Sequence, residues 1–144
     1  MARQQDVEAA ILDRREQVND AIRRELPVQK PEQLYEASRY LMDAGGKRLR
    51  PTMLLLAAES IADVEPLSTE YRSFPTVEGD EIDVMRAAVG IETIQSFTLI
   101  HDDIMDDDDL RRGVPAVHRE YDLSTAILAG DTLFAKAFEY MLDT

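Results

Sequence analysis

Apolar residues recur at helical spacing along most of this chain. In residues 6–26, Val7, Ile11, Val18 and Ile22 fall on one helical face, and we expect that face to point inward. Pro31 and Pro51 stand at plausible first positions of helices, because proline has no N–H to lose there. The pattern therefore predicts helices over residues 6–26, 31–44, 51–62 and 84–106, and a last helix from about residue 123.

The segment that begins at Val84 differs from the other predicted helices because it is apolar on nearly every face. Such a helix belongs in an interior, so we expect it to be the buried central helix. Strand-like alternation and hairpin turn pairs do not stand out, and the predicted fold class is an all-α antiparallel helical bundle. The polar stretch 63–80, which contains Pro66, Ser68, Pro75 and Gly79, is long for a connection and is expected to be a mobile surface insertion.

Composition narrows the class of protein. With 144 residues, 44% of them hydrophobic, the chain can bury one moderate core. The net charge of −13 argues against nucleic acid and anionic membranes as partners. The longest plain apolar run, residues 53–58, is far too short for a transmembrane segment, and the start of the chain has no signal-peptide character. The lack of cysteine excludes disulfides and fits a cytoplasmic location.

The carboxylates at the end of the central segment are spaced to suit a metal ion. Asp102 and Asp106 are one helical turn apart, and Asp103 lies about 100° round the helix. Three unpaired carboxylates this close would repel one another, and a divalent cation removes that repulsion. Mg²⁺ typically takes one or two protein carboxylates together with substrate phosphates and waters. We therefore predict a metal-bridged phosphate here, whereas residues 107–109 fit a solvated acidic surface equally well.

A second motif, GGKRLRP, occupies residues 45–51. Its glycines allow the backbone to approach a ligand closely, and Lys47, Arg48 and Arg50 place three cations within four residues. Such a basic turn suits a diphosphate. Taken alone it could equally be a solvated connection between helices.

Together the motifs resemble those of the trans-isoprenyl diphosphate synthases, or polyprenyl synthetases. The blocks GGKRLRP, QSFTLIHDDIMD, DLRRG and AILAGDTLFAKAFE occur in the order and spacing of that family, over about residues 31–144. The resemblance implies an isoprenoid synthase bundle of which this chain is the N-terminal part. It also implies that a second aspartate-rich motif lies in a C-terminal half that these residues do not contain, so we expect the chain alone to be inactive.

The resemblance further implies roles for individual residues. Mg²⁺ on the allylic diphosphate would be held by Asp102, Asp103 and Asp106, and Arg111 would touch the same diphosphate. Isopentenyl diphosphate would be bound by Lys47, Arg50, Gln95 and Arg112. For His101, Asp131 and His118 we expect structural roles.

The implied reaction is head-to-tail coupling. Mg²⁺ assists departure of the allylic diphosphate, the double bond of isopentenyl diphosphate attacks the resulting cation, and loss of a proton completes the step. Phe97 would lie ~7.5 Å down the helix from Asp102 and form a floor for the growing tail. In the family, short-chain members carry an aromatic residue at the position of Phe97, and farnesyl-producing animal-type members carry a second one at the position of Thr98. Because Thr98 is small, the resemblance implies geranylgeranyl diphosphate as the product, with farnesyl diphosphate as the alternative.

Two other classes of function remain open. One is a non-catalytic partner subunit of such a synthase, although the intact DDIMD speaks against it. The other is an acidic helical module that binds cations without a substrate, which would leave Lys47, Arg50 and Arg112 without a role. For the intact enzyme the resemblance implies a cytoplasmic homodimer.

Overall fold

The computed structural model describes residues 2–65 and 70–144, and this part of the chain is built from α-helices. The helices are α1 (Ala2–Glu25), α2 (Glu32–Asp43), α3 (Leu49–Ala62), α4 (Val84–Met105), α5 (Val117–Glu120) and α6 (Leu123–Leu142), and the short 3₁₀ helix η1 covers Tyr71–Ser73. The predicted all-α bundle is confirmed. Helix α3 begins two residues before the predicted start, so that Pro51 lies in its first turn, where a missing N–H costs nothing.

Two small antiparallel strand pairs interrupt the helical pattern. Strand β1 (Phe74–Pro75) pairs with β2 (Glu81–Ile82), and β3 (Leu110–Arg111) pairs with β4 (Val114–Pro115). The sequence, in which no strand-like alternation stands out, does not predict these strands. Each strand has only two residues, which is too short for an alternating pattern to show in the sequence.

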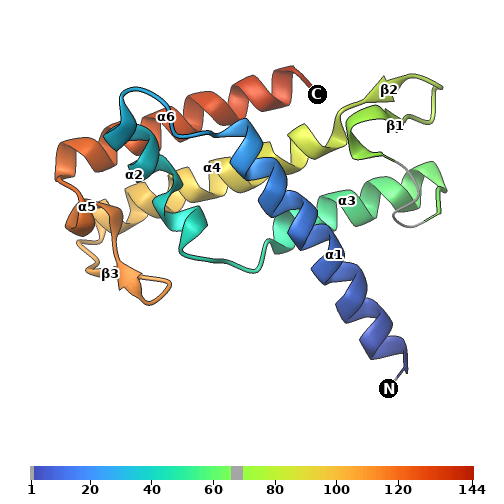
Figure 1. Cartoon of the computed structure of the whole chain (residues 1–144), viewed down its shortest axis with the longest axis horizontal. Helices are drawn as coiled ribbons and strands as arrows, with labels where there is room; N and C mark the ends of the chain where they lie inside the picture. Colours follow the sequence, from blue (N-terminus) through green and yellow to red (C-terminus); the bar gives the residue numbers. More distant parts are fainter. Residues whose placement is uncertain (1, 66–69) are drawn as a thin grey trace.

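Helix α4 runs through the middle of the molecule, with α6 antiparallel beside it and α1 and α3 on its other sides (Figure 1). Its buried residues include Val84, Ala88 and Ile100, which confirms the predicted central position for much of its length. The helix is not buried all round, because Phe97 is only half-buried and Thr98 is exposed. Its inward face is also partly polar, with Glu92, Thr93, Ser96 and Asp103 buried.

Helix α1 crosses the bundle and extends beyond it at its N-terminal end (Figure 1). Val18 and Ile22 are buried as predicted, but Val7 is 57% exposed, and the prediction that it points inward is wrong. No other described element covers the projecting turns, so helical spacing alone could not identify Val7 as exposed. Farther along the helix, the guanidinium of buried Arg14 donates two hydrogen bonds to the Glu59 carboxylate, at 2.6 and 2.9 Å, and thereby joins α1 to α3.

The segment after α3 is anchored rather than loose over its described part. Tyr71 and Phe74 are buried, and the Tyr71 hydroxyl donates to Glu59 at 2.7 Å. Arg72 contacts Glu25 at 2.6 Å and Asp83 at 3.0 Å. Residues 71–75 are thus held by burial and ion pairs, so the predicted mobile insertion is wrong for them. Pro66 and Ser68 lie outside the described residues.

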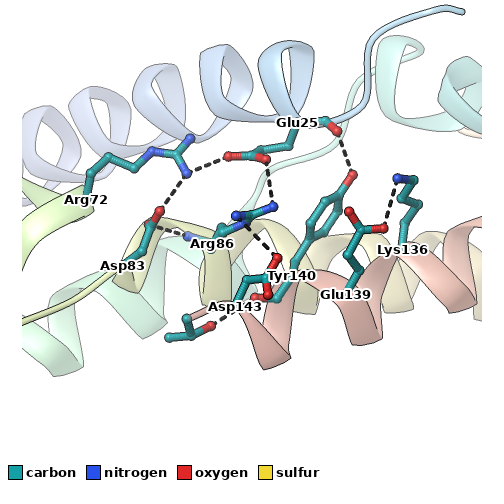
Figure 2. A network of polar contacts seen from close by, with 9 residues as sticks. Glu25, Arg72, Asp83, Arg86, Lys136, Glu139, Tyr140 and Asp143 are labelled. Carbon is teal, nitrogen blue, oxygen red and sulfur yellow. Dashed lines mark hydrogen bonds and ion pairs between the residues drawn. The ribbon is translucent and has the colours of Figure 1, made fainter.

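Figure 2 shows a network of polar contacts at the N-terminal end of α4. Glu25, at the end of α1, is its centre. The Glu25 carboxylate faces Arg72 and Arg86, and the backbone carbonyl of Glu25 accepts a hydrogen bond from the Tyr140 hydroxyl at 2.8 Å. Asp83 caps α4 by accepting a hydrogen bond from the backbone N–H of Arg86. The network ties the ends of α1 and α6 to the start of α4, and the predicted aspartate site lies at the other end of that helix.

Candidate active site

The two outer aspartates of the predicted metal motif are exposed at the end of α4. Asp102 lies in the last turn, and Asp106 is the C-cap residue, whose N–H donates to the carbonyl of Asp102 at 2.8 Å. Neither side chain has an ion pair or hydrogen bond among the described residues. Their spacing of four residues places both carboxylates on the same side of the helix end.

Asp103 behaves differently from its neighbours. Its side chain is 1% exposed, and both of its oxygens accept hydrogen bonds from Arg111, the shortest at 2.6 Å. This hydrogen bonding is the largest cause that raises the pKa of Arg111 above its ordinary value. The expectation of three unpaired carboxylates is therefore wrong for Asp103. Its charge is compensated by a cation eight residues along the chain, which strand β3 folds back onto α4.

The acidic residues that follow the motif are partly paired as well. Arg119, on α5, donates from Nη2 to Asp107 at 2.6 Å and from Nε to Asp109 at 2.9 Å. All three side chains are well exposed. Because exposed pairs contribute little to stability, the contact orients the 107–109 loop more than it stabilises the fold. This role of Arg119 could not be predicted from the sequence, because its partners are ten and twelve residues away.

The glycine turn holds one of its three cations inside the protein. Arg48 adopts a left-handed backbone conformation with φ of 55°, and its side chain is 5% exposed. Its guanidinium donates to Asn19 at 2.8 Å, to Glu92 at 3.1 Å and to the carbonyls of Met42 and Gly45. Burial is the largest cause that lowers its pKa. Arg48 is thus a structural residue, so one cation of the basic turn that suits a diphosphate is not available to a ligand.

Arg112 brings the two predicted motifs together. Its Nη1 donates to the carbonyls of Leu41 and Gly45, at 2.7 and 2.9 Å. A side chain at Gly46 would place its Cβ 3.1 Å from the Arg112 guanidinium carbon, so a glycine at this position leaves room for the arginine. The adjacent residue, Arg111, reaches Asp103. The Arg111–Arg112 pair therefore spans from the aspartate motif to the glycine turn.

The other two basic residues of the turn remain available. Lys47 and Arg50 are both exposed. Neither has an ion pair or hydrogen bond within the described parts of the chain. In a protein with a net charge of −13, these two cations belong to the turn whose Gly45 carbonyl accepts a hydrogen bond from Arg112, and the turn therefore carries local positive charge that suits an anionic ligand. Gln95 is half-buried on α4, and its backbone carbonyl accepts a hydrogen bond from the Thr98 hydroxyl at 2.7 Å. Its side-chain amide has no hydrogen bond among the described residues.

Phe97 lies in a row of aromatic rings between α4 and α6. Its ring centroid is 4.6 Å from that of His101 and 5.1 Å from that of Phe134, and Phe138 continues the row at 4.9 Å. His101 fits against α6 because Gly130 has no side chain, since a Cβ there would lie 2.5 Å from its Nε2. The same nitrogen is 3.7 Å from Asp131. His101 thus packs the two helices together, and Phe97 rests against it.

Below Phe97 the same two helices border an apolar hollow of about 140 Å³ lined by Gly90, Ile94, Ala137, Phe138 and Met141.

His118, the remaining predicted structural residue, is half-buried on α5. Both of its ring nitrogens are buried without a partner among the described residues.

The acidic groups do not by themselves form a complete metal cage. Nowhere in the described residues do three His, Cys, Asp or Glu side chains converge in a way that could hold a metal ion. The exposed pair Asp102 and Asp106 nevertheless fits Mg²⁺, which commonly takes one or two protein carboxylates and completes its shell with phosphate oxygens and waters. Asp103 is committed to Arg111.

Comparison with known proteins identifies the family. Residues 31–144 match the family model described as polyprenyl synthetase, and the chain belongs to this family. It is 80% identical, over 138 residues, to a geranylfarnesyl diphosphate synthase of Natronomonas pharaonis, and 53% identical, over 131 residues, to a geranylgeranyl diphosphate synthase of Methanosarcina mazei. These matches cover 96% and 91% of this chain but 40% and 36% of the relatives.

Solved structures agree with this assignment. A geranylgeranyl pyrophosphate synthetase from Pyrococcus horikoshii superposes with a TM-score of 0.79 at 38% identity, and one from Geoglobus acetivorans with a TM-score of 0.76 at 47% identity. The matches cover 97% and 91% of this chain, and 38% of each solved chain. The fold is therefore that of the isoprenoid synthases, and this chain spans about two fifths of the length of its relatives. No helix in the described residues is long and apolar enough to cross a membrane.

Proposed function

We propose that a protein containing this chain is a prenyltransferase that condenses isopentenyl diphosphate with allylic diphosphates. The observation that carries the proposal is the bridge made by Arg111 and Arg112, which links the aspartate motif to the glycine turn. It brings exposed carboxylates and unpaired cations to neighbouring positions, as two diphosphates that must react with each other require.

Asp102 and Asp106 are proposed to hold Mg²⁺ on the allylic diphosphate. When bound, the metal would neutralise the diphosphate and make it a better leaving group. For Asp103 we propose a positioning role in place of the predicted metal ligation, because its oxygens already accept hydrogen bonds from Arg111. Arg111 is 31% exposed, which leaves part of its guanidinium free to meet a diphosphate oxygen.

Lys47, Arg50 and Arg112 are proposed to bind isopentenyl diphosphate, with Gln95 as a neutral donor on α4. The cations fix the diphosphate, so that the double bond points toward the allylic carbon. The left-handed turn and the buried Arg48 hold the backbone around Lys47 in place before substrate arrives. Such preorganisation lowers the entropic cost of binding.

Two observations bear on the length of the prenyl product, and they favour different products. The relative at 80% identity is named for geranylfarnesyl diphosphate, one isoprene unit longer than geranylgeranyl diphosphate, and we propose the longer chain as the main product. The ring of Phe97 leans against His101 and Phe134, beside the apolar hollow below it. Geranylgeranyl diphosphate, predicted from Phe97 and Thr98, remains the second candidate and is the name of the relative at 53% identity.

Substitutions in the glycine turn test the binding proposal in the full-length protein. Lys47→Gln or Arg50→Gln should weaken isopentenyl diphosphate binding by about 1.5–3 kcal/mol, the range of hydrogen bonds to charged groups. Titration calorimetry with Lys136→Gln as the matched control, a lysine paired with Glu139 on α6, separates this effect from a general loss of positive charge. Unchanged affinity in both turn variants would refute the assignment.

Product analysis of Phe97→Ala tests the proposed floor. Longer chains than those of the parent enzyme are expected if the ring limits the tail. An unchanged length distribution with lower stability would make Phe97 a packing residue only.

Three further expectations stay predictions: the homodimer, the cytoplasmic location and the inactivity of these 144 residues alone. Sedimentation, fractionation and an assay of the isolated chain would test them in that order.

A further inference from the structure

A cavity of about 370 Å³ lies between α2, strand β4 and the end of α5. Val28, Glu36, Tyr40, Asp43 and Tyr121 are among the residues that line it. None of these residues belongs to the proposed prenyltransferase site. The cavity combines two aromatic rings with acidic side chains, a composition that differs from the basic surroundings of the glycine turn.

The two tyrosines form perpendicular walls. The ring centroids of Tyr40 and Tyr121 are 5.8 Å apart, and the ring planes meet at 87°. Both residues are half-buried, so parts of their rings remain open to the cavity. The contact is edge-to-face, so the edge of one ring meets the face of the other. The face of an aromatic ring carries partial negative charge, and the ring faces that this contact leaves open to the cavity attract a cation.

The charges around this corner are mainly negative. Asp43 is paired with Arg39 at 3.1 Å. Glu36 lines the cavity and Glu120 precedes Tyr121, and neither has an ion pair or hydrogen bond in the described residues. Burial, followed by the charges of Glu36 and Glu120, raises the pKa of the Tyr121 hydroxyl. This order of causes agrees with Glu36 lining the same cavity as Tyr121 and with Glu120 preceding Tyr121 in the chain. Two carboxylates close to this ring are thus left without a counter-ion.

We propose that this cavity binds a small ammonium compound, with the cation held against the open ring faces of Tyr40 and Tyr121 and attracted by Glu36 and Glu120. A bare metal ion fits the cavity poorly, because no three acidic or histidine ligands converge among the described residues. An anion would meet unpaired carboxylates. An alkylated ammonium group suits both the apolar walls, which include Val28, and the negative field.

Titration with tetramethylammonium tests the proposal in the full-length protein. Its methyl signal should show saturation transfer from the protein, whereas tert-butanol, a neutral molecule of similar shape, should show none. Tyr121→Leu should weaken binding by about five-fold because one ring face is lost. Tyr121→Phe keeps the ring and should retain the parent affinity.

A surface variant guards against misfolding as an explanation. Glu36→Gln changes an exposed side chain and should weaken tetramethylammonium binding while the unfolding midpoint stays unchanged, whereas Glu78→Gln, an exposed carboxylate outside the cavity, should have no effect. If tert-butanol bound as well as tetramethylammonium, the cavity would not recognise the positive charge, and the proposal would be overturned. The proposal would also be overturned if tetramethylammonium did not bind, or if it bound Tyr121→Leu and Glu36→Gln as tightly as it binds the parent protein.

Discussion

Asp103 illustrates how one residue of a motif can serve a different purpose from its neighbours. Its carboxylate is buried and paired with Arg111, whereas Asp102 is exposed and has no ion pair within residues 2–65 and 70–144. Asp103→Asn should lower the free energy of unfolding by about 1–3 kcal/mol, because Arg111 loses its charged partner in a partly buried position. Urea denaturation of the full-length protein measures this, with Asp102→Asn as the control. Equal stability of the two variants would contradict the buried pair.

Tyr71 should give the protein a specific sensitivity to alkali. Burial, reinforced by the hydrogen bond to Glu59, raises the pKa of the Tyr71 hydroxyl above its ordinary value of 10.0. A group with a raised folded-state pKa adds stability below pH 10 and loses that contribution as the pH rises toward its folded value. Stability should therefore fall above about pH 10 and fall less steeply in Tyr71→Phe, as denaturation midpoints against pH would show. Parallel curves for both proteins would contradict this.

At the scale of elements, the contact between α4 and α6 depends on a glycine. Gly130→Ala would place a Cβ within 2.6 Å of two atoms of the His101 ring, which is itself fixed against Phe97. A loss of about 1–3 kcal/mol in unfolding free energy is expected from such overpacking. The double variant with His101→Ala should recover much of the loss. Additive effects in this cycle would mean that the two residues do not interact.

The helices could be predicted from the sequence, and the small strands could not. Apolar spacing predicts α2 and α6 closely, because each buries one face over several turns, and α4 is predicted from a segment that is apolar on nearly every face. The hairpin of β3 and β4 was missed because its strands have two residues each. The partners of Asp103 and Arg48 were missed for a related reason. Charged residues are normally exposed, and only the fold determines that these two are enclosed with Arg111 and Glu92.

At the scale of the whole molecule, the net charge of −13 should make stability depend on salt. Repulsion among unpaired carboxylates opposes the compact state, and added ions screen it. The urea midpoint should rise as KCl increases from low to about molar concentration. Asp13, Glu16 and Glu78 are exposed and have no ion pair in the part of the chain that the structure describes. Replacing them together, as Asp13→Asn, Glu16→Gln and Glu78→Gln, should flatten that rise. A midpoint that falls with salt would show that screening of favourable ion pairs dominates.

Arg111 and Arg112 are consecutive residues that reach in two directions, one to the end of α4 and the other to the turn before α3. Their α-carbons are separated by one peptide unit, about 3.8 Å. The spacing between the two anchoring points therefore starts from a covalent length, which no change of side-chain rotamer can alter. A displacement of the β3–β4 hairpin must therefore move Arg111 and Arg112 together. The aspartate motif and the glycine turn, which these two arginines contact, would then shift as one unit.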